Sequence, residues 1–584
     1  MNAPSPAIVA QSAVRRLPRI ALWLFCLAYV LPGFIGREPW KNADMQGFGY
    51  MFELARGATD WLAPTLMGLP PEFDALLPYW LGAWAIRASA GWLPADLAVR
   101  LPYMGLLALT LLATWHAVYQ LARSPRAQPV AFAFGGEANP KDYARALADA
   151  GLLALIACLG LAQFSHETTP SLAQLAFTAL TFYGLAALPH PLAETPNGES
   201  GWRPRLRASW PLASLATGLA GLTLSGAPTL SLLFALGGAG VLAVQTCANE
   251  AQRQRQWRWA LGIAAGGLAA AALALAMGLW HWRLDVQGRD WRDWRALGRL
   301  VLWFTWPAWP LAVWTVWRWR HQLRHRHLAL PLWLVGVALA STLTTPYADR
   351  SLLLALPALA VLAAFSLPTL SRSISALIDW FTLLFFSGIA LIVWVVWVSL
   401  QTGMPAKPAA NVARLAIGFE PSFSALAFAL ALAGTVAWGA LVRWRTGRHR
   451  AALWKSLVLP AGGAALCWLL FMTLWLPVLD YARSYVPVVE TLQRTIRQDG
   501  TPAGACVEVT GLARSQVAAL RYHGGFDLRL ARDDEPQCPW RIAGADPANA
   551  GNATATAMPG WQWVTTARRP TDPRDNLRLY RAVR

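Results

Sequence analysis

The chain has 584 residues, of which 56% are apolar and only 14% are charged. Soluble proteins carry about 25% charged residues, so the composition excludes a soluble globular protein. The formal net charge of +19 then points to basic membrane loops and not to nucleic acid, because Lys and Arg gather on the cytoplasmic side of membrane proteins. We therefore expect a polytopic α-helical membrane protein.

Apolar stretches of about 20 residues, the length that crosses a bilayer, recur along the chain. About thirteen spans are expected, starting near residues 17, 101, 148, 171, 209, 229, 259, 300, 329, 351, 379, 422 and 455. Three arginines precede the first span, which predicts a cytoplasmic N-terminus. Basic connections then follow every second span. The alternative is that one span is miscounted and part of this topology is inverted.

Two polar regions lie outside the predicted spans. We expect a transmembrane domain over residues 1–477, in which residues 36–100 form a long periplasmic loop with juxtamembrane helices. Residues 478–584 are expected to form a small periplasmic α/β domain. Its predicted elements are a helix over 480–498, a strand over 506–509, a helix over 515–522, and strands near 540–542 and 577–583. An oxidising periplasm permits a disulfide between Cys506 and Cys538.

Acids and bases at a membrane edge are costly, so they are candidates for function. Asp44 follows the first span, although Asp is also a favoured N-cap residue. His166 and Glu167 occupy a short turn between two spans, where they are either site residues or a solvated turn. Arg350, three residues after Tyr347, is either a phosphate ligand or an anchor that snorkels to the membrane surface.

The segment 281–299 carries five arginines against three aspartates on the expected exterior side. The positive-inside rule predicts few cations on the exterior side. Their presence there indicates an anionic ligand. Arg292 and Arg295 are the candidates from this segment.

Several motifs resemble the aminoarabinose transferase family, bacterial GT-C-fold glycosyltransferases related to protein O-mannosyltransferases. Residues 58–68 read ATDWLAPTLMG, residues 77–81 read LPYWL, and residues 100–102 read RLP, like the first exterior loop of that family. Residues 350–360, RSLLLALPALA, look like the family pattern R-Y-L-L-P-L-L-P-A-L-A. The motifs cover about a tenth of the chain, and the expected architecture covers most of it.

The resemblance implies that a sugar carried on polyprenyl phosphate is transferred on the outer face of a bacterial inner membrane. By position, Asp44 is the expected base, and partial desolvation is expected to raise its pKa. Glu167 matches the second acidic residue of the family pattern, which is expected to position the acceptor or to hold a cation. The residues expected to bind the donor phosphate are Arg350, Arg292, Arg295 and Tyr347, with a contribution from Lys41. Those expected to position the acceptor are His166 and Arg100.

The chain departs from the family pattern at three places. The acid-lysine-diproline element is absent, since residues 71–78 read PEFDALLP; Met45 follows Asp44 where the family has a second acid; and Ser351 replaces a tyrosine. The donor sugar and the metal dependence are therefore open. Glu72 and Asp74 are the candidate ligands for a divalent cation.

The sequence predicts a transferase that moves a monosaccharide to a glycolipid, such as a lipid A-like molecule, or to a protein. Two alternatives remain, a transporter or flippase and a family member without catalysis that serves in envelope assembly. Carboxylates at the membrane midplane, which proton-coupled carriers commonly show, are not evident. Mutation of Asp44 separates an enzyme from an inactive relative.

Overall fold

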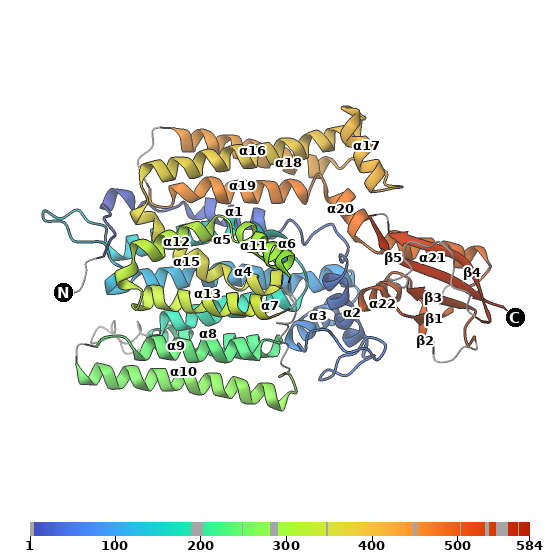
Figure 1. The fold of residues 1–584 in the computed structure, drawn as a ribbon, viewed down its shortest axis with the longest axis horizontal. Helices are drawn as coiled ribbons and strands as arrows, with labels where there is room; N and C mark the ends of the chain where they lie inside the picture. Colours follow the sequence, from blue (N-terminus) through green and yellow to red (C-terminus); the bar gives the residue numbers. More distant parts are fainter. Residues whose placement is uncertain are drawn as a thin grey trace.

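A computed structural model describes residues 5–188, 202–247, 249–280, 290–345, 348–447, 452–502, 504–531, 536–544, 559–569 and 571–583. A helical bundle makes up most of the molecule, and a small sheet domain caps one end, while the N-terminus lies at the other (Figure 1). Tyr347 lies outside the described residues.

Helices form nearly all of the chain before the sheet domain. Those of the first half are α1 (Arg19–Val30), α2 (Ala43–Arg56), α3 (Leu77–Ala88), α4 (Ala95–Ala122), α5 (Pro140–Ala157), α6 (Leu159–Phe164), α7 (Pro170–Ala187), α8 (Trp202–Leu224), α9 (Pro228–Ala243) and α10 (Glu250–Ala276). Those of the second half are α11 (Trp291–Phe304), α12 (Ala308–Arg318), α13 (Arg326–Thr344), α14 (Ala348–Leu353), α15 (Leu356–Ser366), α16 (Arg372–Thr402), α17 (Ala406–Leu415), α18 (Ala425–Thr446), α19 (Lys455–Phe471) and α20 (Leu476–Arg483).

The expected spans can be compared with these helices. Within the described residues, five helices are long and apolar enough to cross a membrane, namely α4, α10, α13, α16 and α18, and a sixth span results if the bent pair α19–α20 is counted. Shorter apolar helices, such as α1 and α9, pack between them. Each of the thirteen expected starts falls in or just before a helix. A polytopic helical membrane protein is thus confirmed.

The continuous span expected from residue 300 is wrong. The chain forms α11, breaks at Thr305–Pro307, and continues as α12. Exposed tryptophans and arginines line α11, including Trp291, Trp294 and Trp303. A helix with an apolar and aromatic face and a cationic face lies in the membrane interface and does not cross.

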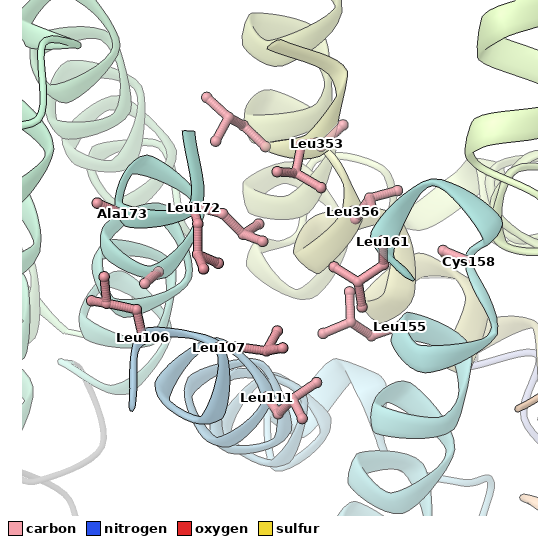
Figure 2. Close-up of a cluster of buried hydrophobic side chains, with 14 of the residues drawn as sticks. Leu106, Leu107, Leu111, Leu155, Cys158, Leu161, Leu172, Ala173, Leu353 and Leu356 are labelled. Atoms are coloured by element: carbon pink, nitrogen blue, oxygen red, sulfur yellow. The ribbon is translucent and has the colours of Figure 1, made fainter. Parts of the chain in front are cut away.

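Leucine side chains fill the centre of the bundle. Figure 2 shows them reaching inward from α4, α5, α6, α7 and the α14–α15 segment. Small residues bring helices into close contact. At Gly184 on α7 an added Cβ would lie 2.8 Å from the Leu215 Cβ, and Gly218 on α8 faces Thr181 in the same way. Close packing at small residues is how helices associate in lipid, where burial of apolar surface gives little drive.

The sheet domain, residues 486–583, contains α21 (Val486–Gln498), α22 (Arg514–Tyr522) and five strands. These are β1 (Cys506–Thr510), β2 (Asp527–Leu530), β3 (Trp540–Gly544), β4 (Trp561–Arg569) and β5 (Asp572–Ala582), in the order β2-β1-β3-β5-β4. The three strands β2, β1 and β3 are parallel, whereas β5 pairs antiparallel with β3 and β4. A disulfide joins Cys506 to Cys538, with their Cα atoms 5.4 Å apart.

The sheet domain packs on the helices of the 36–100 loop. An added Cβ at Gly49 on α2 would lie 2.5 Å from the Ala518 Cβ on α22, so these helices are nearly in backbone contact. Arg521 Nε pairs with Glu53 at 3.2 Å, and Lys41 Nζ pairs with Asp572 at 2.9 Å. The loop is therefore held between the bundle and the sheet domain. The expected domain boundary after residue 477 falls inside α20 and stays a prediction.

Candidate active site

Asp44 lies in the first turn of α2, where a carboxylate is favoured by the helix dipole. It is not the N-cap, because that position is Asn42, whose side chain makes no capping hydrogen bond. The alternative that Asp44 caps α2 is therefore wrong. Gly47, one turn later, lets α2 approach the turn between α6 and α7, since an added Cβ would lie 2.7 Å from the Thr168 carbonyl oxygen.

The Asp44 carboxylate is buried and accepts four hydrogen bonds. Thr168 donates to Oδ1 from its backbone N–H at 2.7 Å and from its hydroxyl at 2.6 Å. Oδ2 accepts from Arg37 Nη1 at 2.6 Å and from the Trp40 backbone N–H at 3.1 Å. A carboxylate has about four acceptor sites, so all of them are occupied.

These partners overturn the expectation that the pKa of Asp44 is raised. Burial alone would raise the pKa, but the Arg37 guanidinium and the two Thr168 donors outweigh it and hold the pKa below its ordinary value. Asp44 is thus a stably ionised carboxylate. This environment suits an electrostatic anchor better than a proton acceptor.

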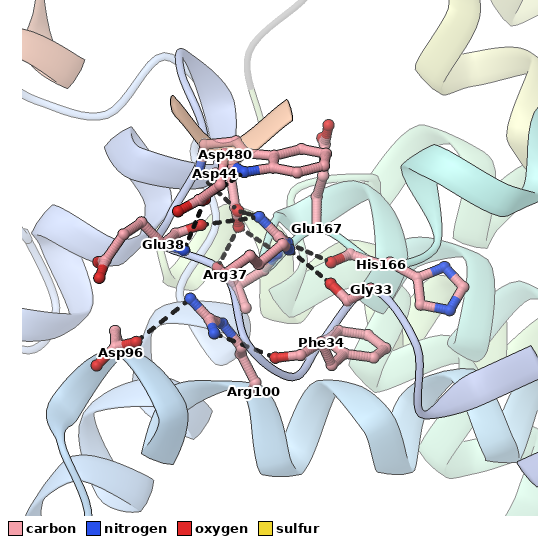
Figure 3. A network of polar contacts seen from close by, with 12 residues as sticks. Gly33, Phe34, Arg37, Glu38, Asp44, Asp96, Arg100, His166, Glu167 and Asp480 are labelled. Carbon is pink, nitrogen blue, oxygen red and sulfur yellow. Dashed lines mark hydrogen bonds and ion pairs between the residues drawn. The ribbon is translucent and has the colours of Figure 1, made fainter. Parts of the chain in front are cut away.

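Arg37 is the partner of Asp44 that the sequence analysis missed. Figure 3 shows its side chain reaching between Asp44 and the turn at His166. The guanidinium also donates to the carbonyl oxygens of Gly33 and Glu38, and to that of His166 at 2.7 Å. One signal was available: a cation directly after the first span, on the side where the positive-inside rule disfavours it.

Glu167 and Arg350 are 183 residues apart and meet at the same end of the bundle. Arg350 Nη2 donates to Glu167 Oε2 at 2.8 Å, and the guanidinium lies 5.4 Å from the centre of the Phe164 ring. The Arg350 side chain keeps 14% of its surface exposed and the Glu167 side chain 9%. Arg350 is thus partly exposed and Glu167 is nearly buried, whereas Arg37 and Asp44 are each 1% exposed.

The two carboxylates have opposite electrostatic environments. Burial raises the pKa of Glu167, the nearby Asp44 charge adds to this, and Arg350 only partly opposes it. The pKa of Asp44 is held low. Where two acids are pushed apart in this way, the one with the raised pKa is suited to proton transfer.

His166 and Arg100 serve the packing around the site. The His166 ring contacts Phe34 and Trp468, and its Nε2 lies 3.0 Å from the Tyr29 carbonyl oxygen. Burial lowers the pKa of His166 to about 4, and the ring points away from Asp44 in Figure 3. Arg100 is buried on α4 and donates to the Phe34 carbonyl oxygen at 3.1 Å.

Arg292 and Arg295 are exposed on α11. This helix packs on α6, which precedes Glu167, and on α14, which carries Arg350. Arg514 pairs with Glu72 at 3.6 Å. Across the described ranges, no three His, Cys, Asp or Glu residues are grouped as metal ligands. The cation site at Glu72 and Asp74, which names only two ligands, stays a prediction.

A second cation that the sequence analysis missed is Arg483, at the end of α20. Its guanidinium lies 4.9 Å from the centre of the Trp40 ring, which Arg37 also approaches, at 4.6 Å. Trp40 Nε1 and the Glu38 backbone N–H both donate to Asp480 Oδ1, at 2.8 and 2.9 Å. The helix before the sheet domain thus touches the loop that carries Asp44, and no local sequence pattern shows this contact.

Comparisons with known proteins give a likeness in structure. No protein-family model matches the sequence, and neither does any curated protein. The structure is similar to ArnT from Cupriavidus metallidurans in the apo state, with a TM-score of 0.56 and 13% identity over 96% of each chain. It is also similar to the same ArnT bound to undecaprenyl phosphate, with a TM-score of 0.57 and 14% identity over 96% of each chain. The chain therefore has the fold of ArnT, a polytopic GT-C fold with a small C-terminal sheet domain.

Proposed function

We propose that this protein is a membrane glycosyltransferase that moves a monosaccharide from a polyprenyl-phosphate donor to a glycolipid or protein acceptor. The observation that carries the proposal is the Glu167–Arg350 pair, whose guanidinium is partly exposed, beside the fully buried Asp44–Arg37 pair. A proton acceptor and cations for a phosphate leaving group thus lie together at one end of the bundle. The ArnT structure that holds undecaprenyl phosphate has the same fold.

Glu167 is the proton acceptor in this proposal. The acceptor hydroxyl oxygen bonds to the anomeric carbon, the bond from that carbon to the phosphate oxygen breaks, and the hydroxyl proton passes to Glu167. General bases work best when their pKa lies near the operating pH, and the pKa of Glu167 is raised toward that range. This assignment replaces Asp44, the base expected from the resemblance.

Arg350 and Arg483 receive the donor phosphate. Charge develops on the phosphate oxygen as the sugar leaves, and a positioned guanidinium stabilises it. When Arg350 turns to the phosphate, Glu167 loses the ion pair that lowers its pKa. Donor binding thereby makes Glu167 a stronger base.

Asp44 holds the site together and stays ionised. It fixes Arg37, which in turn binds the carbonyl oxygen of His166 beside Glu167. The buried charge of Asp44 also raises the pKa of Glu167 across this short distance. The proposed setting is the outer face of a bacterial inner membrane, with the sheet domain in the periplasm.

Purified protein in lipid vesicles tests this proposal. With a polyprenyl-phosphate-linked sugar and an extract of envelope acceptors, the wild type should release free polyprenyl phosphate, and Glu167→Gln should not. If labelled donor moves across the vesicle membrane without any release, the transporter alternative is correct. If neither occurs with any extract, the protein is an inactive relative.

A further inference from the structure

A long groove runs along α1 on the lipid-facing side of the bundle. Its walls come from α1, α4 and α5, and its volume is about 890 Å³, within the range of about 300–1,000 Å³ that is typical of ligand pockets. The lining is apolar over most of its length and includes Trp23, Leu27, Gly105, Leu109 and Leu112. Trp23 and Leu112 are largely exposed, so lipid reaches the groove from the side.

One end of the groove is cationic. Arg16, Arg19 and Arg145 line it together with a single acid, Asp149. Asp149 is buried and already accepts from Trp115 Nε1 at 2.9 Å and from the Leu17 backbone N–H. Within the described part of the chain, neither Arg19 nor Arg145 donates a hydrogen bond. This end lies near the N-terminus, away from the sheet domain (Figure 1).

Arg16 is also available to a ligand. It pairs with Asp142 at 3.2 Å, but 65% of its side chain is exposed, so this pair is held in solvent. Exposed ion pairs of this kind contribute little and exchange easily. Three guanidinium groups can therefore turn to one anion at this end of the groove.

We propose that the groove binds an anionic phospholipid, with its phosphate at Arg16, Arg19 and Arg145 and an acyl chain along α1. The twelve residues of α1 span about 18 Å at the rise of an α-helix, and one leaflet of the bilayer core is about 15 Å thick. The groove along α1 is thus about as long as the hydrocarbon part of one leaflet is thick. Basic pockets between membrane helices are known to hold anionic headgroups.

This ligand is distinct from the proposed sugar donor. The donor phosphate belongs at Arg350, at the end where Asp44 and the sheet domain lie. The groove arginines come instead from the start of α1 and from α5. A zwitterionic lipid offers the same chain but no net charge for the three arginines. The arrangement therefore selects for headgroup charge, and it does so independently of the transferase proposal.

Native mass spectrometry of the full-length protein in a nonionic detergent tests the inference. Phosphatidylglycerol and phosphatidylcholine are titrated against the wild type, an Arg19→Gln/Arg145→Gln double variant, and Gly105→Leu. An added Cβ at Gly105 meets nothing within 4 Å, so a leucine there starts into open space and is expected to occupy the groove. The matched controls are Arg318→Gln/Arg320→Gln, exposed on the bundle, and Gly262→Leu, where an added Cβ also meets nothing within 4 Å.

The expected result is one phosphatidylglycerol bound at least tenfold more tightly than phosphatidylcholine. The arginine variant should lose this preference, Gly105→Leu should lose the bound lipid, and both controls should match the wild type. Equal binding of the two lipids, or unchanged binding by the arginine variant, overturns the inference. Displacement of phosphatidylglycerol by polyprenyl phosphate at equal concentration also overturns it, because the groove would then hold the donor chain.

Discussion

Asp44 Oδ1 accepts hydrogen bonds from both the backbone N–H and the hydroxyl of Thr168, at 2.7 and 2.6 Å. The two residues are 124 positions apart, one at the start of α2 and the other in the turn between α6 and α7. This contact places Glu167, the neighbour of Thr168, beside the loop that follows α1. The geometry of both carboxylates thus depends on one pair of hydrogen bonds.

Replacing Thr168 with valine should destabilise the protein. The change keeps the shape and the backbone N–H donor but removes the hydroxyl, one of the two donors to Oδ1 of a buried, ionised carboxylate. Hydrogen bonds to charged groups contribute about 1.5–3 kcal/mol. Thermal unfolding in detergent measures the loss. Thr114→Val is the control, because that buried hydroxyl donates only to the Thr110 carbonyl oxygen in its own helix, and its removal should have little effect.

Gly47→Ala should separate α2 from the turn that carries Thr168. The new Cβ would lie 2.7 Å from the Thr168 carbonyl oxygen, and overpacking of this kind costs about 1–3 kcal/mol. The variant should therefore unfold at a lower temperature and show lower transfer activity than the wild type. Gly262→Ala, on α10 where the added Cβ meets nothing, should instead be neutral or slightly stabilising. Equal behaviour of the two variants would show that the approach of α2 is not tight.

Replacing each of the two carboxylates by its amide should have different effects on the free energy of unfolding at neutral pH. The pKa of Asp44 is lowered in the folded state, so its contribution is present above the unfolded pKa and is lost as the pH falls through the folded value. The pKa of Glu167 is raised, so its contribution is present below the unfolded pKa and is lost as the pH rises through the folded value.

Asp44→Asn should therefore destabilise by about 3–5 kcal/mol, as is found when one partner of a buried ion pair is removed. Glu167→Gln should be neutral or stabilising, because the amide oxygen still accepts from the partly exposed Arg350 and the carboxylate charge that burial disfavours is removed. Unfolding of both variants at pH 7 checks this. A large loss in Glu167→Gln contradicts the raised pKa.

The acid limb of the pH–rate profile should report Glu167. Activity should rise with pH as Glu167 loses its proton, and Arg350 lowers the pKa of that carboxyl. Arg350→Gln should thus move the limb to higher pH, in addition to lowering kcat/KM. Arg497→Gln, exposed on α21, is the control and should leave the profile unchanged. If the acid limb of the pH–rate profile stays at the same pH in Arg350→Gln, a group other than Glu167 is responsible for it.

Much of the fold follows from apolar periodicity, which is a local signal. The starts near 329 and 455 fall in α13 and at the first residue of α19. The signal fails where helices break: α11 and α12 were expected as one span, and the helix expected over 480–498 is divided into α20 and α21. It also missed β2, whose alternating sequence DLRL is only four residues long and is mostly exposed.

The candidate site divides in the same way. Asp44, Glu167 and Arg350 were predicted because ionisable residues at a membrane edge are costly. Arg37 and Arg483 were missed because their importance arises from contacts with distant segments, such as the Arg483–Trp40 contact. The environments of the two carboxylates depend on those contacts. The direction of the pKa shift of Asp44 was therefore predicted wrongly from the sequence.

Mass spectrometry of envelope glycolipids and glycoproteins tests the central claim most directly. The strains are the parent, a deletion, and the deletion complemented by the wild type, Glu167→Gln or Asp44→Asn at matched protein level. We predict that a hexose- or pentose-sized mass is lost on deletion, returns with the wild type, and does not return with Glu167→Gln. An unchanged envelope on deletion, or full restoration by Glu167→Gln, would contradict the account.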